Sequence, residues 1–480
     1  MAATPLPLFD RVELARFLAD AGDARNVGIG ELTLLAGGAI QENWGFRARF
    51  IGGPFDGEHD LVLRTDASTG IPSSLGRNQE FTVLRAVFGA GVTVPEPLWD
   101  CADPAVIGKP FFVMRRVAGT AQGRQITTDP ALEAALPALA ARLGSELALI
   151  QRVRPPRPDL GCLRSIGPEQ HIAAFRAYLD DHPRPRPVIE WAARWLETHR
   201  PEPLAPVLCH RDFRTGNYMV DGTHLTAILD WEFAGWGDPD EDIGWFCCKG
   251  WRFARLEREA GGIAARTPFY QAYEAASGRR LDPERVRFWE VLANVRWAVI
   301  ALQQSDRVLL GGARDLSTAI IGRRATESEL ELLMLLDPDG SPASNPHTVE
   351  TAAVHDGLRD LPSGAALLAL GREQLLNELS PFLPPERQRA LHLLATAIAI
   401  AEREAIAGSA PAQDIIAQLA EFYGGPVDAL LPRLAADLRA GAFERCDTRQ
   451  RAAHAILWRL TMMKLREGNP QFLAANGFGE

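Results

Sequence analysis

Apolar and polar residues in the first ninety positions change from helical spacing to strand spacing and back. Residues 6–21 place apolar side chains every three or four positions, which predicts an amphipathic helix. Residues 31–35, 44–50 and 60–64 are short apolar-rich runs, and we expect three strands there. A second helix is predicted over residues 74–89 from the same helical spacing. The N-terminal part is therefore expected to be a small β-sheet accompanied by helices.

The central part of the chain is predicted to be mostly helical, with a strand and a hairpin inserted. Residues 110–114 are an apolar run that predicts a strand, and residues 132–153 show a strong helical period that ends at a run of prolines. Two short strands, 218–220 and 225–229, flank an Asp-Gly pair, which is typical of a tight hairpin turn. Further helices are expected over residues 269–277, 284–303 and 325–336.

The last third of the chain is predicted to be all helical. Residues 337–346 are polar and rich in proline and glycine, as is typical of a linker between domains. The expected helices beyond it span residues 348–361, 363–378, 385–406, 412–423, 426–440 and 448–467. No set of acid and base residues stands out there, so we expect packing, homodimer formation or partner binding. The whole pattern predicts an α+β fold class with four parts, namely 1–114, 115–336, the linker 337–346 and 347–480.

Composition and net charge argue against several classes of protein. A net charge of −10 over 480 residues and a pI near 5.6 argue against non-specific nucleic-acid binding, which needs basic surfaces. No apolar run reaches the length of a membrane span, and the first residues lack the pattern of a secretion signal. The six cysteines include no CxxC pair, which disfavours a zinc site or a disulfide framework. We therefore expect a cytoplasmic protein with neither nucleic acid nor membrane as its partner.

The candidate chemistry centres on residues 210–217, HRDFRTGN, and on Asp230 after the predicted hairpin. Asp212 stands five residues before Asn217, a spacing typical of a kinase catalytic loop. The hairpin would place Asn217, at its start, beside Asp230, at its end. Phosphoryl transfer needs a group that accepts a hydroxyl proton, assigned to Asp212, and oxygen ligands for Mg²⁺, assigned to Asn217 and Asp230. The alternative is that the His-x-Asp tripeptide occurs by chance and its aspartate only caps a helix or forms an Asx-turn.

An acidic segment, residues 237–242, follows the hairpin. One of its aspartates is placed to cap a helix that starts near Pro239, and Asp242 would lie one turn inside that helix. From there the Asp242 carboxylate could reach back to the backbone of the catalytic loop and hold it in shape. We assign His210 and Asp242 to structural support, and a solvated acidic helix start is the alternative.

Arg64 and Glu80 are the first candidates for nucleotide binding. They stand on the third predicted strand and on the following helix, where kinases place a basic residue and its glutamate partner. The basic residue of kinases is usually a lysine, but no lysine precedes Lys109 in this chain. Arginine is a rigid fork and does not replace lysine in every contact. A surface ion pair is the alternative explanation of this arrangement.

Two further segments are candidates for nucleotide contact. Gly37 and Gly38 lie in the predicted loop 36–43, which could fold over phosphates with its backbone N–H groups. A hairpin turn without a ligand is the alternative for this loop. The strand 110–114 ends in exposed turn residues, as suits a hinge between two lobes.

With these residues in hand, positions from about 25 to 335 resemble the aminoglycoside phosphotransferase family. They look most like the subgroup related to kinase domains that are fused to acyl-CoA dehydrogenases. The resemblance is carried by LVLRTD at 61–66, NQEFTVLRAV at 78–87, PFFVMRRVAGT at 110–120, the catalytic segment, and LDWEFAGWGDPDEDIGWFC at 229–247. Residues 346–480 resemble a helical domain of unknown function that accompanies such kinases.

The resemblance implies a bilobal, protein-kinase-like fold with a β-rich N-lobe and a larger, mostly helical C-lobe. It implies ATP between the lobes, Mg²⁺ as cofactor and a hydroxyl group of a small molecule as acceptor. The residue roles that it implies are Asp212 as catalytic base, Asn217 and Asp230 as Mg²⁺ ligands, Asp242 as support of the loop, and Met114, Arg115 and Arg116 against the nucleotide base. An aminoglycoside-like compound and a hydroxyacyl thioester are the candidate acceptors.

Two other functions remain open at this point. A nucleotide-binding scaffold, or pseudokinase, acting through the helical C-terminal domain is favoured by the missing lysine. The intact set of Asp212, Asn217 and Asp230 argues against it. A protein kinase is disfavoured because the chain lacks the DFG and APE arrangement and an evident activation loop between Asp230 and Asp242.

Overall fold

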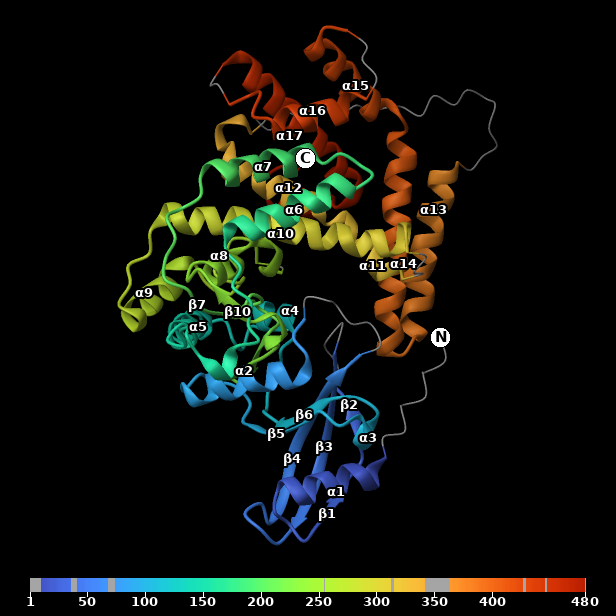
Figure 1. Cartoon of the computed structure of the whole chain (residues 1–480). Coiled ribbons are helices and arrows are strands. Elements are labelled where there is room, and N and C mark those ends of the chain that lie inside the picture. Colours follow the sequence, from blue (N-terminus) through green and yellow to red (C-terminus); the bar gives the residue numbers. More distant parts are fainter. Residues whose placement is uncertain are drawn as a thin grey trace. The chain divides into compact units, whose positions relative to one another are not determined.

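The computed structural model describes residues 10–35, 41–67, 74–253, 255–311, 315–341, 363–425, 429–444 and 447–479 (Figure 1). The chain forms two compact units. The first consists of Met1–Gly167 and Glu202–Trp289, and the second of Pro168–Pro201 and Glu290–Glu480. Among the described residues, no helix combines the length and the apolar character that a membrane span requires.

An antiparallel sheet forms the N-terminal part of the first unit (Figure 1). Its strands lie in the order β1 (Asn26–Ile29), β3 (Gln41–Ile51), β4 (Gly57–Asp66), β6 (Phe111–Arg115) and β5 (Pro97–Cys101), and the short β2 (Thr33–Leu34) pairs with β3. Strands β2, β3, β4 and β6 confirm the four strands expected here. Residues 41–43, which were expected in the loop 36–43, belong to β3. Gly37 and Gly38 lie outside the described residues.

The two faces of this sheet are covered by different helices. On one face, Leu14 and Leu18 of α1 (Arg11–Ala21) pack with Leu63 of β4. On the other, Phe81 of α2 (Arg77–Gly89) packs with Met114 of β6. Because side chains alternate along a strand, every second residue of β4 and β6 faces α2. The α2 face is the one on which the candidate site is built.

The rest of the first unit surrounds a second set of paired strands. The helices of this part are α4 (Gly123–Thr128), α5 (Leu136–Ile150), α8 (Glu241–Cys247) and α9 (Arg266–Ser277), whereas α3 (Pro104–Ile107) packs with α1 at the N-terminal sheet. The boundary between the units falls inside α10 (Pro283–Leu309). β7 (Val207–Cys209) pairs with β10 (Gly235–Gly237), and β8 (Tyr218–Asp221) pairs with β9 (His224–Ile228). The predicted hairpin is therefore present. Its turn residues are Gly222 and Thr223, one position later than expected, and Gly222 has a positive φ of 53° that suits glycine.

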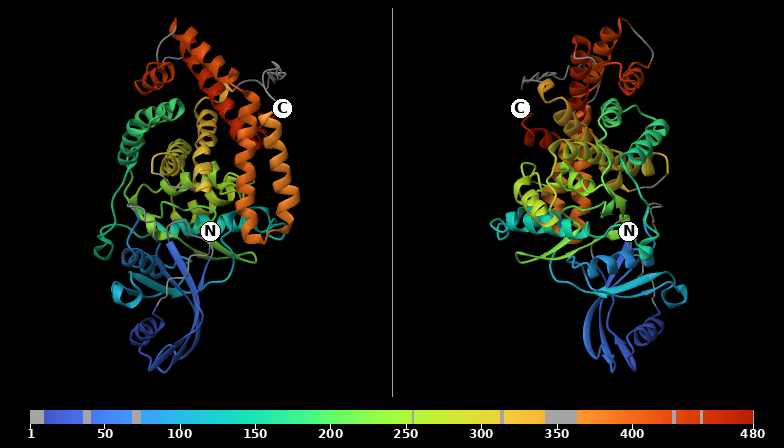
Figure 2. Two further views of the ribbon diagram at one scale, coloured as in Figure 1. Left: turned by 90° about the vertical axis from the view of Figure 1, so that its right-hand side faces the viewer. Right: turned by 60° about the vertical axis from the view of Figure 1, so that its left-hand side comes forward.

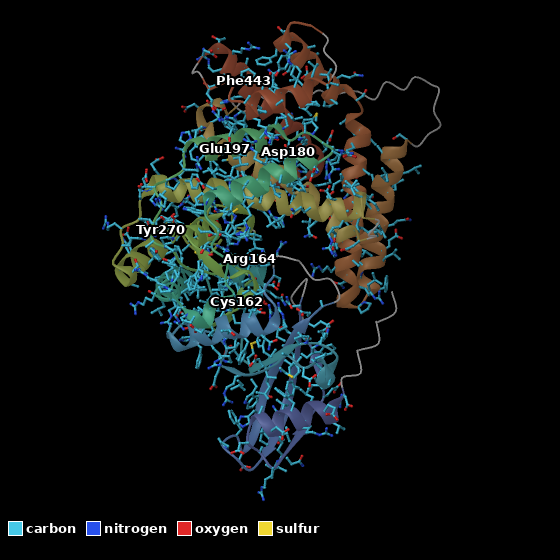
Figure 3. All side chains as sticks on the ribbon, viewed as in Figure 1. Cys162, Arg164, Asp180, Glu197, Tyr270 and Phe443 are labelled. Carbon is cyan, nitrogen blue, oxygen red and sulfur yellow. The ribbon has the colours of Figure 1, made fainter. Side chains whose placement is uncertain are left out.

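The described residues of the second unit form helices and their connections, with no strand among them. It contains α6 (Pro168–Asp181), α7 (Pro187–Thr198), α11 (Leu316–Arg323), α12 (Ala325–Leu336), α13 (Gly364–Glu373), α14 (Pro385–Ala407), α15 (Ala410–Tyr423), α16 (Leu430–Arg439), α17 (Thr448–Gly468) and α18 (Pro470–Ala475). Helices α13 and α14 run side by side (Figures 1 and 2). Asp180 of α6 and Glu197 of α7 (Figure 3) form ion pairs with Arg439 and Arg176. The predicted helix 348–361 lies outside the described residues.

Candidate active site

Asp242 holds the start of the catalytic segment. Its two carboxylate oxygens accept hydrogen bonds from the backbone N–H groups of His210 and Arg211, each at 2.7 Å. Arg211 has a φ of 62°, which is uncommon outside glycine, so these bonds fix a strained turn. Helix α8 starts at Glu241, so Asp242 lies in its first turn. The sequence predicts a position one turn inside the helix. Burial, with Glu241 nearby, raises the pKa of Asp242 to about 7.

His210 ties the same segment to the end of the hairpin. Its Nε2 lies 2.8 Å from the carbonyl oxygen of Leu229, and its Nδ1 accepts a hydrogen bond from the backbone N–H of Asp212 at 3.2 Å. This network assigns a neutral imidazole with the proton on Nε2. Burial lowers the pKa of His210, in agreement with the neutral form. The ring thus fixes the backbone on both sides of Asp212 without carrying charge.

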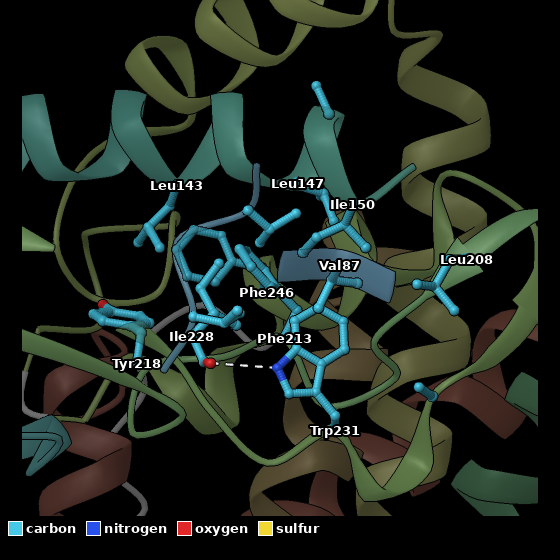
Figure 4. Packing of buried hydrophobic residues seen from close by; sticks show 14 of the residues in the cluster. Val87, Leu143, Leu147, Ile150, Leu208, Phe213, Tyr218, Ile228, Trp231 and Phe246 are labelled. Carbon is cyan, nitrogen blue, oxygen red and sulfur yellow. Dashed lines mark hydrogen bonds between the residues drawn. The ribbon is translucent and has the colours of Figure 1, made fainter. Parts of the chain in front are cut away.

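The Asp212 carboxylate is held by three donors. Its Oδ1 accepts from Trp245 Nε1 and from Arg214 Nε, each at 3.0 Å, and its Oδ2 accepts from Asn217 Nδ2 at 2.6 Å. The side chain keeps 16% of its surface exposed. Asp212 is therefore rigidly oriented and still reachable. Phe213, the next residue, is buried in the core and anchors this position (Figure 4).

Asn217 and Asp230 lie side by side, as the hairpin predicted. The backbone N–H of Leu229 donates to the carbonyl oxygen of Asn217 at 2.8 Å, which joins the two ends of the hairpin. Asp230 has a φ of 61° and a side chain that is 29% exposed. The next residue, Trp231, is buried and donates from Nε1 to the carbonyl of Ile228 (Figure 4). Asp212 and Asp230 are thus each followed by a buried aromatic anchor.

The oxygen atoms of Asn217 and Asp230 fit a hard cation. Asn217 Nδ2 is committed to Asp212, and within the described residues Asn217 Oδ1 accepts no hydrogen bond. Asp230 Oδ1 pairs with Arg64, while its Oδ2 has no partner among the same residues. One amide oxygen and one carboxylate oxygen suit Mg²⁺, which takes its remaining ligands from phosphates and water. In the described part of the chain no three His, Cys, Asp or Glu side chains gather as an all-protein metal site.

Arg64 lies at the centre of a buried polar cluster. Its Nε lies 3.1 Å from Glu80 Oε1, and its Nη1 contacts Asn43 Oδ1 at 3.2 Å and Asp230 Oδ1 at 2.9 Å. Burial alone would lower the pKa of Arg64, but Glu80 and Asp230 outweigh it and raise the pKa. Arg64 Nη2 is buried and has no hydrogen-bond partner within the described residues. The predicted Arg64–Glu80 ion pair is confirmed, whereas the link to Asp230 was not expected.

Arg77 and Glu232 extend this cluster, and sequence reasoning missed both. Arg77 is fully buried, and it contacts Glu80 and pairs with Asp66 at 2.9 Å. Glu232 accepts hydrogen bonds from Gln41 Nε2 and, at 3.2 Å, from Ser74 Oγ. Burial raises the pKa of Glu232 to about 7. An acidic residue between two aromatic ones, as in Trp-Glu-Phe, is the signal that could have identified Glu232.

Of the three predicted hinge residues, Met114 has a side chain that faces the site. Met114 pairs with Val62 across the sheet and faces α2, on the side of Arg64. Arg115 faces the opposite side, where its guanidinium contacts Glu96 and His59. Arg116 is exposed, and its N–H donates to the carbonyl of Asp60 at 3.0 Å. The structure therefore brings Met114 toward the site but not the side chain of Arg115.

A largely buried cluster of basic and aromatic residues lies next to Asp212. The guanidinium of Arg214 lies 4.6 Å from the ring centroid of Trp251, a cation–π distance, and also bonds to Asp212. Trp251 packs on Trp245 with ring centroids 5.0 Å apart. Arg252 is buried and donates to the carbonyls of Cys247 and Leu256. The carboxylate thus has cationic and aromatic neighbours.

Curated relatives share part of this chain. Acyl-CoA dehydrogenase family member 10 of Mus musculus is 30% identical over 200 residues, which are 40% of this chain and 18% of the mouse protein. Acyl-CoA dehydrogenase family member 11 of Homo sapiens is 30% identical over 189 residues, or 37% of this chain and 23% of the human protein. The chain therefore spans less than a quarter of either relative.

Solved structures share the fold. A structure from Ralstonia eutropha that is assigned to the aminoglycoside phosphotransferases aligns with a TM-score of 0.56 and 21% identity, over 68% of this chain and 98% of that one. A ternary complex of the aminoglycoside phosphotransferase APH(4)-Ia with AMP-PNP and hygromycin B aligns with a TM-score of 0.44 and 18% identity, over 67% and 98%. The first of these establishes the kinase-like α+β fold.

Family models match two segments. Residues 381–472 match a domain of unknown function (DUF6285), which agrees with the helical tail expected from sequence. Residues 32–289, more than half of the 480-residue chain, match the phosphotransferase enzyme family of the aminoglycoside phosphotransferases. The chain belongs to this phosphotransferase family.

Proposed function

We propose that the protein is an ATP- and Mg²⁺-dependent kinase that phosphorylates a hydroxyl group of a small molecule. The observation that carries the proposal is the arrangement around Asp212. A carboxylate fixed by Asn217 and Trp245 stands beside two free oxygen ligands, and a positive charge at Arg64 lies next to them. These are the parts that phosphoryl transfer requires: a proton acceptor, cation ligands and charge stabilisation.

Asp212 is proposed as the catalytic base. Its Oδ2 accepts one hydrogen bond from the described residues, whereas Oδ1 accepts two. Oδ2 is therefore the oxygen that takes the proton of the acceptor hydroxyl. The three donors hold the carboxylate in place, which lowers the cost of orientation in the transition state. His210 and Asp242 keep the backbone of this segment fixed.

Asn217 Oδ1 and Asp230 Oδ2 are proposed to hold Mg²⁺. A bound Mg²⁺ neutralises charge on the phosphate oxygens and aligns the transferred group. The protein's part is to keep the two oxygens adjacent, which the bond between Leu229 and Asn217 does. Because Arg64 occupies Asp230 Oδ1, it fixes the orientation of the remaining oxygen.

The nucleotide is proposed to bind along the α2 face of the sheet. Arg64 has an unused buried donor at Nη2, which a phosphate oxygen would satisfy. Glu80 holds Arg64 in position. Met114 and the main chain of Arg115 and Arg116 are assigned to the base. Gly37 and Gly38 are proposed to cover the phosphates with their backbone N–H groups.

The acceptor is proposed to be a hydroxyacyl thioester or an aminoglycoside-like compound. Arg214 is ion-paired with Asp212, so this pair adds no net charge beside the acceptor hydroxyl and does not select between the two. The relatives named as acyl-CoA dehydrogenases make a hydroxyacyl thioester the acceptor of choice for a first test.

The testing experiment is a metabolite-library screen for ATP consumption with the purified chain, followed by mass spectrometry of the product. The proposal expects one acceptor class to gain a phosphate group in a reaction that requires Mg²⁺. Asp212→Ala protein is the control and should form no product. Phosphorylation of the same acceptor by this variant would contradict the role of Asp212.

One observation favours a second candidate, a nucleotide-binding scaffold. Arg64 is already saturated on two of its nitrogens, and its ion pair with Asp230 occupies one of the proposed ligand oxygens. If ATP stabilises the protein in a thermal-shift assay while no extract yields a phosphorylated product, the scaffold replaces the kinase.

A further inference from the structure

A cavity of about 300 Å³ lies in the second unit, apart from any residue assigned above. Its walls come from α11, α12, α14 and the segment that joins α17 to α18, and α11 contacts α14 (Figure 1). The cavity includes part of the segment that matches the domain of unknown function. Its lining includes arginines at positions 323, 324 and 403 and aliphatic groups such as Ile400 and Leu465, together with Glu327 and the uncharged polar residues Thr396, Asn469 and Gln471.

The charges of the cavity wall do not cancel. Glu327 is the acidic residue of the lining, and both of its oxygens are occupied, one by Arg324 Nε at 3.1 Å and one by Asn469 Nδ2 at 3.0 Å. Arg323 pairs with Glu404 at 2.6 Å. Arg403 has no direct ion-pair partner among the residues that the structure describes, and only the more distant carboxylates of Glu402 and Glu404 act on its charge.

Arg403 is fixed in place by main-chain contacts. Its Nε donates to the carbonyl of Glu467 at 2.7 Å, and its Nη2 approaches the carbonyl of Gly468 at 3.4 Å. These carbonyls end α17, where a cation is favourable. Nη1 donates to no described residue. Burial lowers the pKa of Arg403, because its charged guanidinium is partly removed from water. A bound anion would stabilise this charge.

We propose that this cavity binds a small organic anion with a short aliphatic body. The anionic head, a carboxylate or a phosphate monoester, bonds to Arg403 Nη1 and lies near Arg323. The aliphatic body packs on Ile400 and Leu465. A guanidinium held in one geometry recognises either head through charge-assisted hydrogen bonds. This site is independent of the proposed phosphotransferase activity, since it shares no residue with it.

Calorimetric titration of the full chain, without nucleotide, tests the proposal with hexanoate, hexyl phosphate, hexan-1-ol and hexylammonium. We expect hexanoate or hexyl phosphate to bind, and the comparison of the two identifies the preferred head. Hexan-1-ol should bind at least about tenfold more weakly, and hexylammonium should not bind. Arg403→Gln should weaken anion binding at least about tenfold. Arg389→Gln, an equal charge change on the exposed surface of the same helix, should leave it unchanged.

Three results would overturn the proposal. They are no binding by either anion, equal binding of hexan-1-ol and the anions, and anion binding that Arg403→Gln leaves intact. If Arg403→Gln lowers the melting temperature, Arg323→Gln replaces it, because Arg323 pairs with the exposed Glu404 side chain. Unchanged binding in that variant is equally contradictory.

Discussion

A single guanidinium connects the sheet, helix α2 and the end of the hairpin. Arg64 contacts Glu80 of α2, Asn43 of β3 and Asp230 after β9. Lysine has one nitrogen with which to serve these partners, while the arginine fork serves several at once. The arginine at this position is therefore compatible with an active phosphotransferase, and the absence of an early lysine does not by itself indicate a scaffold.

Replacing Arg64 by lysine tests this argument. Arg64→Lys keeps the charge but cannot contact Glu80, Asn43 and Asp230 together, so we expect the KM for ATP to rise about tenfold. Steady-state kinetics with the acceptor from the library screen measures it. Arg47→Lys is the matched control, because Arg47 lies on the same sheet in an exposed pair with Asp60. An unchanged KM in Arg64→Lys would mean that Arg64 has no role in nucleotide binding.

At the level of residues, the sequence predicts contacts between side chains that lie on successive elements or at the two ends of one hairpin. The Arg64–Glu80 pair follows from the order of strand and helix, and Asn217 lies beside Asp230 because a hairpin joins them. The contact of Glu232 with Gln41 joins residues 191 positions apart. No spacing rule covers such a distance, and only the burial of a charge among aromatic residues could have suggested a partner.

At the level of elements, close backbone contact fixes α5 against α9. A Cβ atom on Gly144 would lie 2.3 Å from the carbonyl oxygen of Phe269 and 3.1 Å from the N atom of Tyr273. A side chain at this position must therefore push the two helices apart. The same pair of helices supports the hydrophobic core beneath the catalytic segment, with Leu143 and Leu147 of α5 close to Phe246 (Figure 4).

Gly144→Ala should destabilise the first unit by about 1–3 kcal/mol through overpacking. Gly89→Ala, at the end of α2, meets no atom within 4 Å and should be neutral or slightly stabilising. Urea unfolding followed by tryptophan fluorescence measures both changes. Equal stability of the two variants would show that α5 and α9 can separate at no cost.

Periodicity predicts long elements better than short ones. Helices α5, α10 and α17 were expected because their apolar positions repeat over many turns. Strand β1 was missed because it has only four residues with one of them buried. Helix α7 was also missed, although the buried Val188, Ile189 and Leu196 give it an apolar face that periodicity could have found.

At the level of the whole molecule, the compact units do not follow the order of the chain. Residues 168–201 belong to the second unit, although chain segments on both sides of them belong to the first. A sequence pattern can predict a break such as 337–346 but does not show which distant segments pack together. The division of the chain at residues 114 and 336, and dimerisation through the helical tail, stay predictions.

A buried ionic cluster makes the stability of the second unit depend on pH. Lys464 lies 3.5 Å from Glu329, which also pairs with Arg186 at 3.1 Å. Burial, only partly opposed by Glu329, lowers the pKa of Lys464 to about 8. An unfolded lysine titrates near about 10.4. Between these values the unfolded chain binds the extra proton, so the free energy of unfolding rises with pH across this window and the penalty is fully present below it.

Lys464→Met removes this titration. We expect the free energy of unfolding of the natural protein to rise by up to about 3 kcal/mol relative to the variant between about pH 8 and pH 10.4. Denaturant unfolding of both proteins at the two ends of that range measures it. Parallel pH profiles would show that Lys464 has an ordinary pKa.

Asp212 is proposed to remove the acceptor proton while the rest of the site binds Mg²⁺ and nucleotide. The most direct measurement is the rate of phosphate transfer to the acceptor by Asp212→Asn, with nucleotide affinity determined on the same protein. Asparagine keeps the shape and cannot act as a base, so we predict a rate at least about 100-fold lower with ATP affinity unchanged. Phosphate transfer at the natural rate would contradict the account.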